Sequence, residues 1–535
     1  MASTLKTTFL GEIRGKTEDG VTKYLGIKYA NLKNRLADAE LIEQSLEGII
    51  DATNDGPTAV SLPTGCEIEL NAIQHSLPNK QLIQSDLDCL NLNITLPSGT
   101  TPSSKLPVFL FIHGGGLVIG ANSWPQFDYA RFVKLSEERG LPIVGVSINY
   151  RLGTFGFLTS NELRNSGYKA NNGIRDQRIA MRWVQRHIHD FGGDPENVTL
   201  AGMSAGGASV TYHLHSDEPL FKRAIVMSGT FLLIRALPYE VHEKNYLKVI
   251  EALGLTNVTT EARIQALLEI PGHEIMSKIS STALTALAID GDMVLPGITF
   301  ADVEKCRSDV PRGKAWCRDL MIGDAQTDSS IISVLEPNIK SNCAKRFSAA
   351  MRTVLAAHPN EADHILAAYG ITEETSDSNS LLSVLDYLND IMFFAPVLAF
   401  ARGWNGNAHV YYFNEGNPWN GAWKGSATHI LDLAYLFQNF REFLTAGQQK
   451  VGTAFAEDIF KFCHGTSPWP AVTEGNFDEG FSARVYGSSD KGVVRSVVNQ
   501  AYGGETMRRD ALRNLAAEVS LDDLAEVFAA FKATE

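Results

Sequence analysis

The feature that most constrains the fold is a serine between two glycines, at the point where an apolar run meets a run of small residues. Residues 200–209 read LAGMSAGGAS, which places Ser204 two positions from both Gly202 and Gly206. Residues 197–200 are rich in β-branched and apolar side chains, as in a buried strand. Because glycine has no Cβ, a strand and the following helix can approach closely at such a turn. The pattern predicts a sharp strand–turn–helix that exposes the Ser204 hydroxyl, with a glycine-rich turn of no function as the alternative.

Short apolar runs alternate with amphipathic segments along the rest of the chain. The alternation predicts a mostly parallel sheet, with strands buried on both faces and helices packed against it. No repeat and no break between distinct halves is found, so we expect one domain over residues 1–535. The apolar spacing in residues 507–532 predicts C-terminal helices that close the fold or mediate a dimer. The predicted strands are residues 108–112, 143–148, 198–201, 224–227, 320–322 and 410–413, and the clearest helices are residues 176–189 and 245–253.

The acidic balance of the chain limits its partners. With 47 basic and 61 acidic side chains, the formal net charge is -14, which argues against nucleic acid or an anionic membrane as the main partner. The longest apolar run, residues 391–401, contains Pro396 and is shorter than the roughly 18 residues that span a bilayer. The N-terminus lacks the apolar segment of a secretory signal, which favours a cytoplasmic protein and leaves secretion open.

A second glycine-rich segment lies about 90 residues before Ser204. Residues 113–116 read HGGG and follow the predicted strand 108–112. Glycines allow backbone N–H groups to approach a reacting carbonyl oxygen without a Cβ in the way. We therefore expect Gly115 and Gly116, joined by the N–H of Ala205, to stabilise an oxyanion. The two glycine motifs, each after a predicted strand and in this order, are typical of the α/β-hydrolase fold.

Several longer segments resemble the family of type-B carboxylesterases, cholinesterases and lipases. The resemblance runs along nearly the whole chain, in residues 24–30, 88–93, 149–153, 175–209 and 290–292. It implies an α/β-hydrolase fold in which large insertions form a gorge. It also implies a catalytic triad of serine, an acid and histidine, in that chain order.

The resemblance identifies candidates for the other members of the triad. Residues 425–437 resemble the histidine loop of the family, which makes His429 the general base for Ser204. Residues 323–330 resemble the acid loop, with Asp328 where most members have glutamate, and Asp324 is the competing acid. Ser228 resembles a serine that supports the catalytic histidine, although a simple turn at the end of a strand fits it nearly as well.

Two of the six cysteines resemble the ends of a disulfide-closed loop of the family. A bond between Cys66 and Cys89 would close about 24 residues and stabilise the fold by roughly 3 kcal/mol in the chain-entropy model. In a reducing compartment both would instead be free thiols. Cys306 and Cys317 are close enough in sequence for a second loop, with free buried thiols as the equal alternative.

Departures from the family bear on the substrate. Cholinesterases carry a tryptophan where this chain has Asn79, and a choline site needs such an aromatic face for cation–π contact. Many relatives have glutamate before the nucleophile, whereas this chain has Met203 and lacks that negative charge. Both changes argue against cationic substrates.

The sequence thus predicts a serine carboxylic ester hydrolase that acts through an acyl-enzyme on neutral, moderately hydrophobic esters. The mechanism requires no cofactor and no metal, the expected partner is the small-molecule ester, and the oligomeric state is a monomer or a homodimer. One alternative is a biosynthetic lactone or thioester hydrolase, or an acyltransferase, on the same fold. A remoter one is a non-enzymatic adhesion protein.

Overall fold

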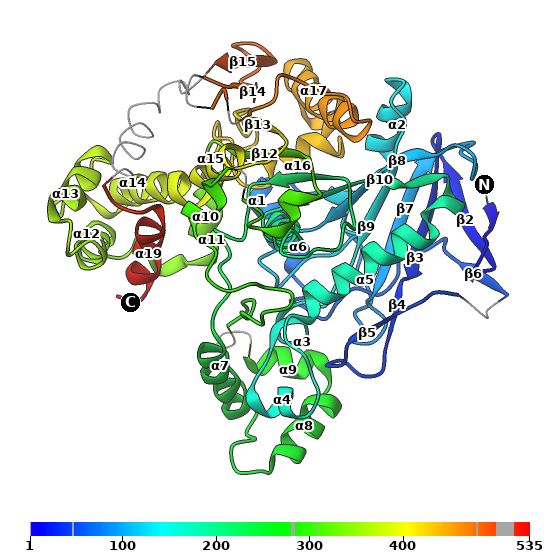
Figure 1. Ribbon diagram of the computed structural model, residues 1–535, viewed down its shortest axis with the longest axis horizontal. Helices are drawn as coiled ribbons and strands as arrows, with labels where there is room; N and C mark the ends of the chain where they lie inside the picture. The colour runs from blue at the N-terminus through cyan, green and yellow to red at the C-terminus, as the bar shows by residue number, and fades with distance from the viewer. Residues whose placement is uncertain are drawn as a thin grey trace.

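One mixed β-sheet forms the centre of the computed structural model, which describes residues 2–44, 48–279, 284–306, 308–473, 475–477, 480–498 and 518–534 (Figure 1). Its strands are β1 Ala2–Lys6, β2 Glu12–Glu18, β3 Val21–Lys28, β6 Ile49–Asp51, β7 Asn91–Pro97, β8 Leu106–Ile112, β9 Val144–Ile148, β10 Gly193–Met203, β11 Arg223–Met227, β12 Asp319–Ala325, β13 Asn407–Phe413, β14 Ser482–Tyr486 and β15 Val494–Val498. A separate hairpin pairs β4 Ala30–Leu32 with β5 Ala39–Leu41.

The strand order is β1-β2-β3-β7-β9-β8-β10-β11-β12-β13-β14-β15, with β6 beside β2. Every neighbouring pair from β9 to β14 is parallel, and the pairs toward both edges, from β1 to β9 and between β14 and β15, are antiparallel. The six predicted strands are β8 to β13, which all lie in the parallel centre. The predicted α/β class with a mostly parallel central sheet is therefore confirmed.

Successive residues of the central strands belong to two different cores. In β8, Leu110 and Ile112 pack into a cluster that includes residues of α5 and α6, whereas Phe109 and Phe111 pack into a second cluster with residues of α2 and α17. This alternation follows from the two-residue period of a strand. Helices consequently cover both faces of the sheet, as Figure 1 shows for α17 and α5. The helices are α1 Gly65–Ile73, α2 Ala130–Glu138, α3 Gly153–Phe157, α4 Asn161–Asn165, α5 Asn172–His187, α6 Ala205–His213, α7 Tyr239–Ala252, α8 Thr260–Glu269, α9 Gly272–Ile279, α10 Phe300–Glu304, α11 Ile332–Leu335, α12 Cys343–Val354, α13 Pro359–Ala368, α14 Asp377–Asn389, α15 Ala395–Arg402, α16 Leu431–Leu436, α17 Ala446–Cys463 and α19 Leu521–Lys532.

The apolar segment around Pro396 is longer in the structure than its sequence suggests. Helical structure continues from Asp377 to Arg402, and Pro396 follows a π-helical turn over Asp390–Phe394 instead of ending the helix. This stretch is long and apolar enough to cross a membrane, yet 67% of its apolar window is buried. Such burial is what a core helix shows.

The C-terminal helix α19 closes one end of the molecule. Leu524, Val527 and Phe531 are buried, α19 packs against α12, and the Phe531 ring meets Phe347 edge-on at 5.5 Å. The predicted C-terminal packing is thus present for this segment. The rest of the predicted helical region, residues 507–517, lies outside the described residues.

The six cysteines are free thiols. The disulfide between Cys66 and Cys89 that the family resemblance implied is therefore not formed. The two thiols belong to separate buried clusters: Cys66, on α1, packs in the α2 and α17 cluster, and Cys89 packs in the other. Cys66 Sγ instead donates a hydrogen bond of 3.7 Å to Gln126. Cys306 and Cys317 are likewise unpaired, so the free-thiol alternative holds for both pairs.

Candidate active site

Ser204 occupies a strained turn between β10 and α6. Its φ of 58° and ψ of -123° are a conformation that costs a non-glycine residue about 1–3 kcal/mol. The turn is held because the Ser204 N–H donates to the Met227 carbonyl at 2.9 Å, next to the end of β11. Ala205 begins α6, so its N–H has no partner inside the helix. The predicted strand–turn–helix is therefore present, and Ser204 is partly exposed.

The glycines of the motif are required by close backbone contacts. A Cβ on Gly202 would lie 2.3 Å from the Gly206 carbonyl oxygen, and one on Gly206 would lie 2.0 Å from the carbonyl oxygen of Ile112. A Cβ on Gly229 would lie 2.2 Å from the oxygen of Ser204. Since real Cβ atoms do not approach so closely, only glycine lets β8, β10 and α6 meet at the serine.

The glycine-rich segment after β8 lies beside this turn. A Cβ on Gly114 would lie 3.1 Å from Cβ of Ser204, so the two segments are in contact. Gly115 and Gly116 have φ of 91° and 61°, conformations that favour glycine. The Gly115 carbonyl accepts hydrogen bonds from the N–H groups of Val118 and Ile119, both at 3.0 Å. This turn leaves Gly115 and Gly116 partly exposed next to Ser204.

His113 holds the same loop in place through its contacts with Tyr150. Its ring stacks on Tyr150 at 4.6 Å, and the Tyr150 hydroxyl donates to the His113 carbonyl at 3.0 Å. Burial lowers the pKa of His113 to about 4, so the ring is neutral at physiological pH. His113 therefore positions the loop without adding charge to the site.

His429 and Asp328 form a buried pair. The Nδ1 atom of His429 lies 2.7 Å from Oδ1 of Asp328, and the second carboxylate oxygen accepts the Ala325 N–H at 2.7 Å. The two loops are joined by a parallel bridge between Thr327 and Thr428, which continues the pairing of β12 with β13. This close pairing explains how the shorter aspartate reaches the imidazole.

Asp324, the competing acid, lies inside β12. Its register partner in β13 is Tyr412, and it precedes the bridge that joins the two loops. The carboxylate that meets His429 is that of Asp328.

A further buried carboxyl lies next to this pair and was not found by sequence reasoning. Asp432 is fully buried at the start of α16, three residues after His429, and its Oδ1 accepts the Leu433 N–H at 2.9 Å. Burial, reinforced by the charge of Asp328, raises the pKa of Asp432 to about 8. Two neighbouring carboxylates cannot both ionise cheaply in a buried site. Asp432 is therefore protonated at neutral pH, whereas Asp328 bonds to the imidazole.

The raised pKa of Asp432 predicts a pH dependence of stability. The folded state holds the proton more tightly than the unfolded state, whose pKa is near the ordinary 3.8. Asp432 therefore lowers the free energy of unfolding progressively as pH rises from about 4 to about 8, by up to about 1.4 kcal/mol per pH unit. Urea unfolding at pH 5, 6, 7 and 8 should show a flatter profile for Asp432→Asn than for the wild type. Asp309→Asn, at an exposed aspartate, should keep the wild-type slope, and parallel profiles for all three proteins would contradict the assignment.

Two other positions singled out in the sequence lie beside the serine. Ser228 directly follows β11, has a φ of 49° and donates its N–H to the Gly323 carbonyl at 2.9 Å. Its buried hydroxyl has no hydrogen-bond partner among the described residues, His429 included. Met203, the residue before Ser204, is buried in the α2 and α17 cluster. The residue that precedes Ser204 therefore contributes a buried apolar side chain and no charge.

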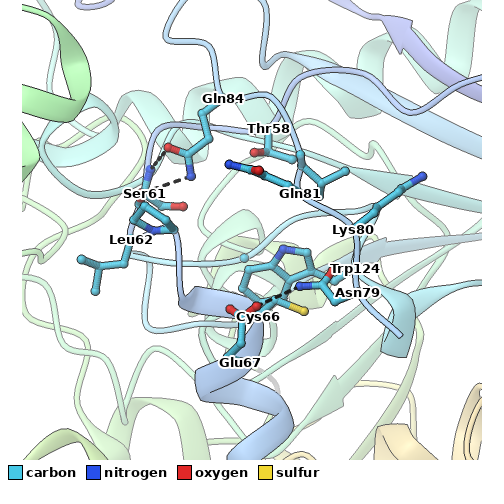
Figure 2. Close-up of a pocket in the computed structure, with 13 residues that line it drawn as sticks. Thr58, Ser61, Leu62, Cys66, Glu67, Asn79, Lys80, Gln81, Gln84 and Trp124 are labelled. Atoms are coloured by element: carbon cyan, nitrogen blue, oxygen red, sulfur yellow. Dashed lines mark hydrogen bonds between the residues drawn. The ribbon is translucent and has the colours of Figure 1, made fainter. Parts of the chain in front are cut away.

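A cavity of about 460 Å³ lies beyond the glycine-rich segment that follows β8, the predicted oxyanion loop (Figure 2). Gly120 contributes to its wall, and a Cβ there would lie 3.0 Å from the Gly114 carbonyl oxygen. Asn79 lines the rim, at the position where the resemblance places a choline-binding tryptophan. Within the part of the chain that the structure describes, no group of three or more His, Cys, Asp or Glu side chains is placed to hold a metal ion.

Comparison with known proteins agrees with this geometry. The model of the carboxylesterase family matches residues 2–469. The chain belongs to this family. This carboxylesterase family member is 27% identical to the para-nitrobenzyl esterase of Bacillus subtilis (strain 168) over 452 residues, 82% of this chain and 84% of that protein. It is 28% identical to Lipase 1 of Yarrowia lipolytica (strain CLIB 122 / E 150) over 492 residues, 88% of each.

The solved structures agree on the fold. A PNB esterase structure matches with a TM-score of 0.75 and 24% identity, covering 95% of this chain and 99% of that one. The family resemblance and the α/β-hydrolase fold predicted from the sequence are confirmed. Family membership and the esterase relatives make the protein a carboxylesterase-type hydrolase.

Proposed function

We propose that this protein hydrolyses neutral carboxylic esters through an acyl-enzyme formed on Ser204. The observation that carries the proposal is the buried 2.7 Å contact between His429 and Asp328, in a fold whose strained turn presents Ser204. Asp328 fixes the imidazole tautomer and stabilises the imidazolium that forms during the reaction. With Nδ1 bonded to Asp328, Nε2 is the nitrogen left to take the serine proton.

The reaction proceeds in two acyl-transfer steps. His429 removes the proton of Ser204 as the serine oxygen attacks the ester carbonyl, and the same proton then passes to the departing alcohol. Water, activated by His429, attacks the acyl-enzyme and releases the acid. The N–H groups of Gly115, Gly116 and Ala205 stabilise the oxyanion in both steps, and loss of one such donor costs roughly 10²- to 10³-fold in rate.

The surroundings of the serine favour an uncharged substrate. Met203 places an apolar side chain where a glutamate would attract a cation, and Asn79 offers no aromatic face. The carboxylate of Asp328 is already bonded to His429. Moderately hydrophobic acyl groups suit a site built among such apolar residues.

Labelling with a fluorophosphonate tests the proposal. The reagent forms a covalent bond with an activated serine, so we expect intact mass to rise by one adduct and peptide mass spectrometry to place it on Ser204. His429→Ala should label far more slowly, because the serine loses its base. Folded wild-type protein that stays unlabelled, or an adduct on another serine, would overturn the assignment.

A further inference from the structure

The cavity beyond the oxyanion loop is lined by two hydroxyl groups that belong to otherwise buried residues. Thr58 is 4% exposed and Ser61 is 6% exposed, and both line the cavity. Neither hydroxyl is among the enclosed side-chain atoms that lack a partner, so both reach the open space of the cavity, whereas the Thr58 N–H donates to the Ile83 carbonyl at 2.8 Å. A ligand in the cavity can therefore replace the water around both hydroxyls with its own hydrogen bonds.

The backbone around these hydroxyls is rigid. The side chain of Gln84 donates to the Ser61 carbonyl at 3.1 Å and accepts the Ser61 N–H at 3.4 Å. A parallel bridge also joins Thr58 to Gln84. Figure 2 shows Thr58, Ser61 and Gln84 on one side of the cavity, with Trp124 and Cys66 on the other. The hydroxyls are therefore held in place before any ligand arrives, which lowers the entropic cost of binding.

Charged groups of both signs lie at the rim of the cavity. Lys80 forms an ion pair with Asp55, and Glu67 accepts a hydrogen bond from Asn79 Nδ2 at 3.2 Å. Because Lys80 is paired and the one other carboxylate is bonded to an amide, the rim presents no cluster of one sign that would select a charged ligand.

Trp124 supplies an apolar surface opposite the hydroxyls. Its side chain is 7% exposed, stacks near Phe127 at 6.4 Å, and fits against Gly65, where a Cβ would lie 3.2 Å from its ring. An aromatic face opposed by fixed hydroxyl and amide groups matches a ligand with C–H groups on one side and O–H groups on the other. We propose that this cavity binds an uncharged, polyhydroxylated part of the substrate, so that the esters hydrolysed carry a glycerol- or sugar-like group.

This inference rests on the proposed function, because the cavity adjoins the oxyanion loop through Gly120. A group held there would position the ester carbonyl near Gly115 and Gly116. A site that hydrogen-bonds substrate hydroxyls discriminates strongly against an analogue that lacks them.

A matched pair of esters tests the inference. Glyceryl monobutyrate and n-propyl butyrate share the acyl group and a three-carbon alcohol, and differ by two hydroxyls. We expect wild-type kcat/KM to favour the glyceryl ester and Thr58→Val/Ser61→Ala to reduce that preference about tenfold, as the loss of one or two hydrogen bonds would. The value for n-propyl butyrate should change less than about twofold. The control Thr353→Val/Ser378→Ala, at exposed positions of α12 and α14, should keep the wild-type ratio.

A second variant keeps the test valid if the double variant does not fold. Gln81 is exposed at the rim, and Gln81→Phe should fill the cavity and cause the same drop in preference. An unchanged ratio in a folded variant, no wild-type preference, or a preference for butyrylcholine would overturn the inference. If the fluorophosphonate does not label the wild type, the proposed function itself is overturned. The labelling result therefore distinguishes failure of the proposed function from failure of the cavity inference.

Discussion

Ser204→Ala should lower kcat for any substrate ester by about 10⁶-fold, because the acyl-enzyme cannot form without the hydroxyl. Removal of the nucleophile from a dissected serine hydrolase had an effect of this order. The expected residual rate is 10³- to 10⁴-fold above that in water, since the oxyanion donors and substrate binding remain. Alanine retains the strained φ of 58°, so the unfolding free energy should change little. Single-turnover kinetics with a chromogenic butyrate ester measure the loss.

The control for this variant is Ser166→Ala, at an exposed serine after α4. It should keep wild-type activity. Because trace contamination by wild type limits such measurements, the Ser204→Ala protein should also be tested after fluorophosphonate treatment. A residual activity above one hundredth of the wild type that resists this reagent would contradict the role of Ser204.

The parallel centre of the sheet could be predicted because its strands are buried on both faces. Residues of β8 and β9 are almost all apolar, and this composition can be recognised in the sequence without knowledge of any partner strand. The antiparallel strand β2 has the sequence EIRGKTE and exposes part of its surface, so its charged residues hide the pattern. Edge strands depend on their neighbours for burial, which a single sequence does not display.

Where the candidate site lies on the sheet follows from the same regularity. Ser204 and Asp328 come directly after β10 and β12, and the carboxyl ends of parallel strands meet at one edge of a sheet. His429 comes from the longer segment after β13, and only the family resemblance identified Asp328 and His429 as the partners of Ser204. The role assigned to Asp328 over Asp324 was a hypothesis, and the contact with His429 now favours it.

Features that depend on packing between segments distant in sequence could not be predicted from the sequence. The protonation of Asp432 arises from its burial beside Asp328, more than a hundred residues away in sequence. Thr58 and Ser61 are ordinary polar residues in the sequence, and only the folded chain places both of them on the wall of one cavity. The separation of Cys66 from Cys89 is likewise set by which face of the sheet each segment covers.

The largest predicted loss of stability comes from a buried ion pair next to α5. Arg151 and Asp176 are both buried, and the guanidinium donates to the carboxylate at 2.8 and 2.7 Å. A further guanidinium nitrogen donates to the carbonyls of Arg35 and Ala37, at 3.1 and 2.7 Å. The ion pair therefore connects the β4–β5 hairpin, which contains Arg35 and Ala37, to the segment that follows β9.

Asp176→Ala should lower the free energy of unfolding by about 3–5 kcal/mol, because it leaves the Arg151 charge buried without a counter-ion. Replacing both partners with apolar side chains of similar volume, as in Arg151→Met/Asp176→Leu, should recover much of the loss, since no charge then remains to be desolvated. The double variant still leaves the two carbonyls without their donor, so recovery should stop short of the wild type. Urea denaturation of the three proteins measures these differences. Two results would contradict a charge-based role for the pair. One is an Asp176→Ala protein whose free energy of unfolding is less than about 1 kcal/mol below that of the wild type, and the other is a double variant less stable than Asp176→Ala.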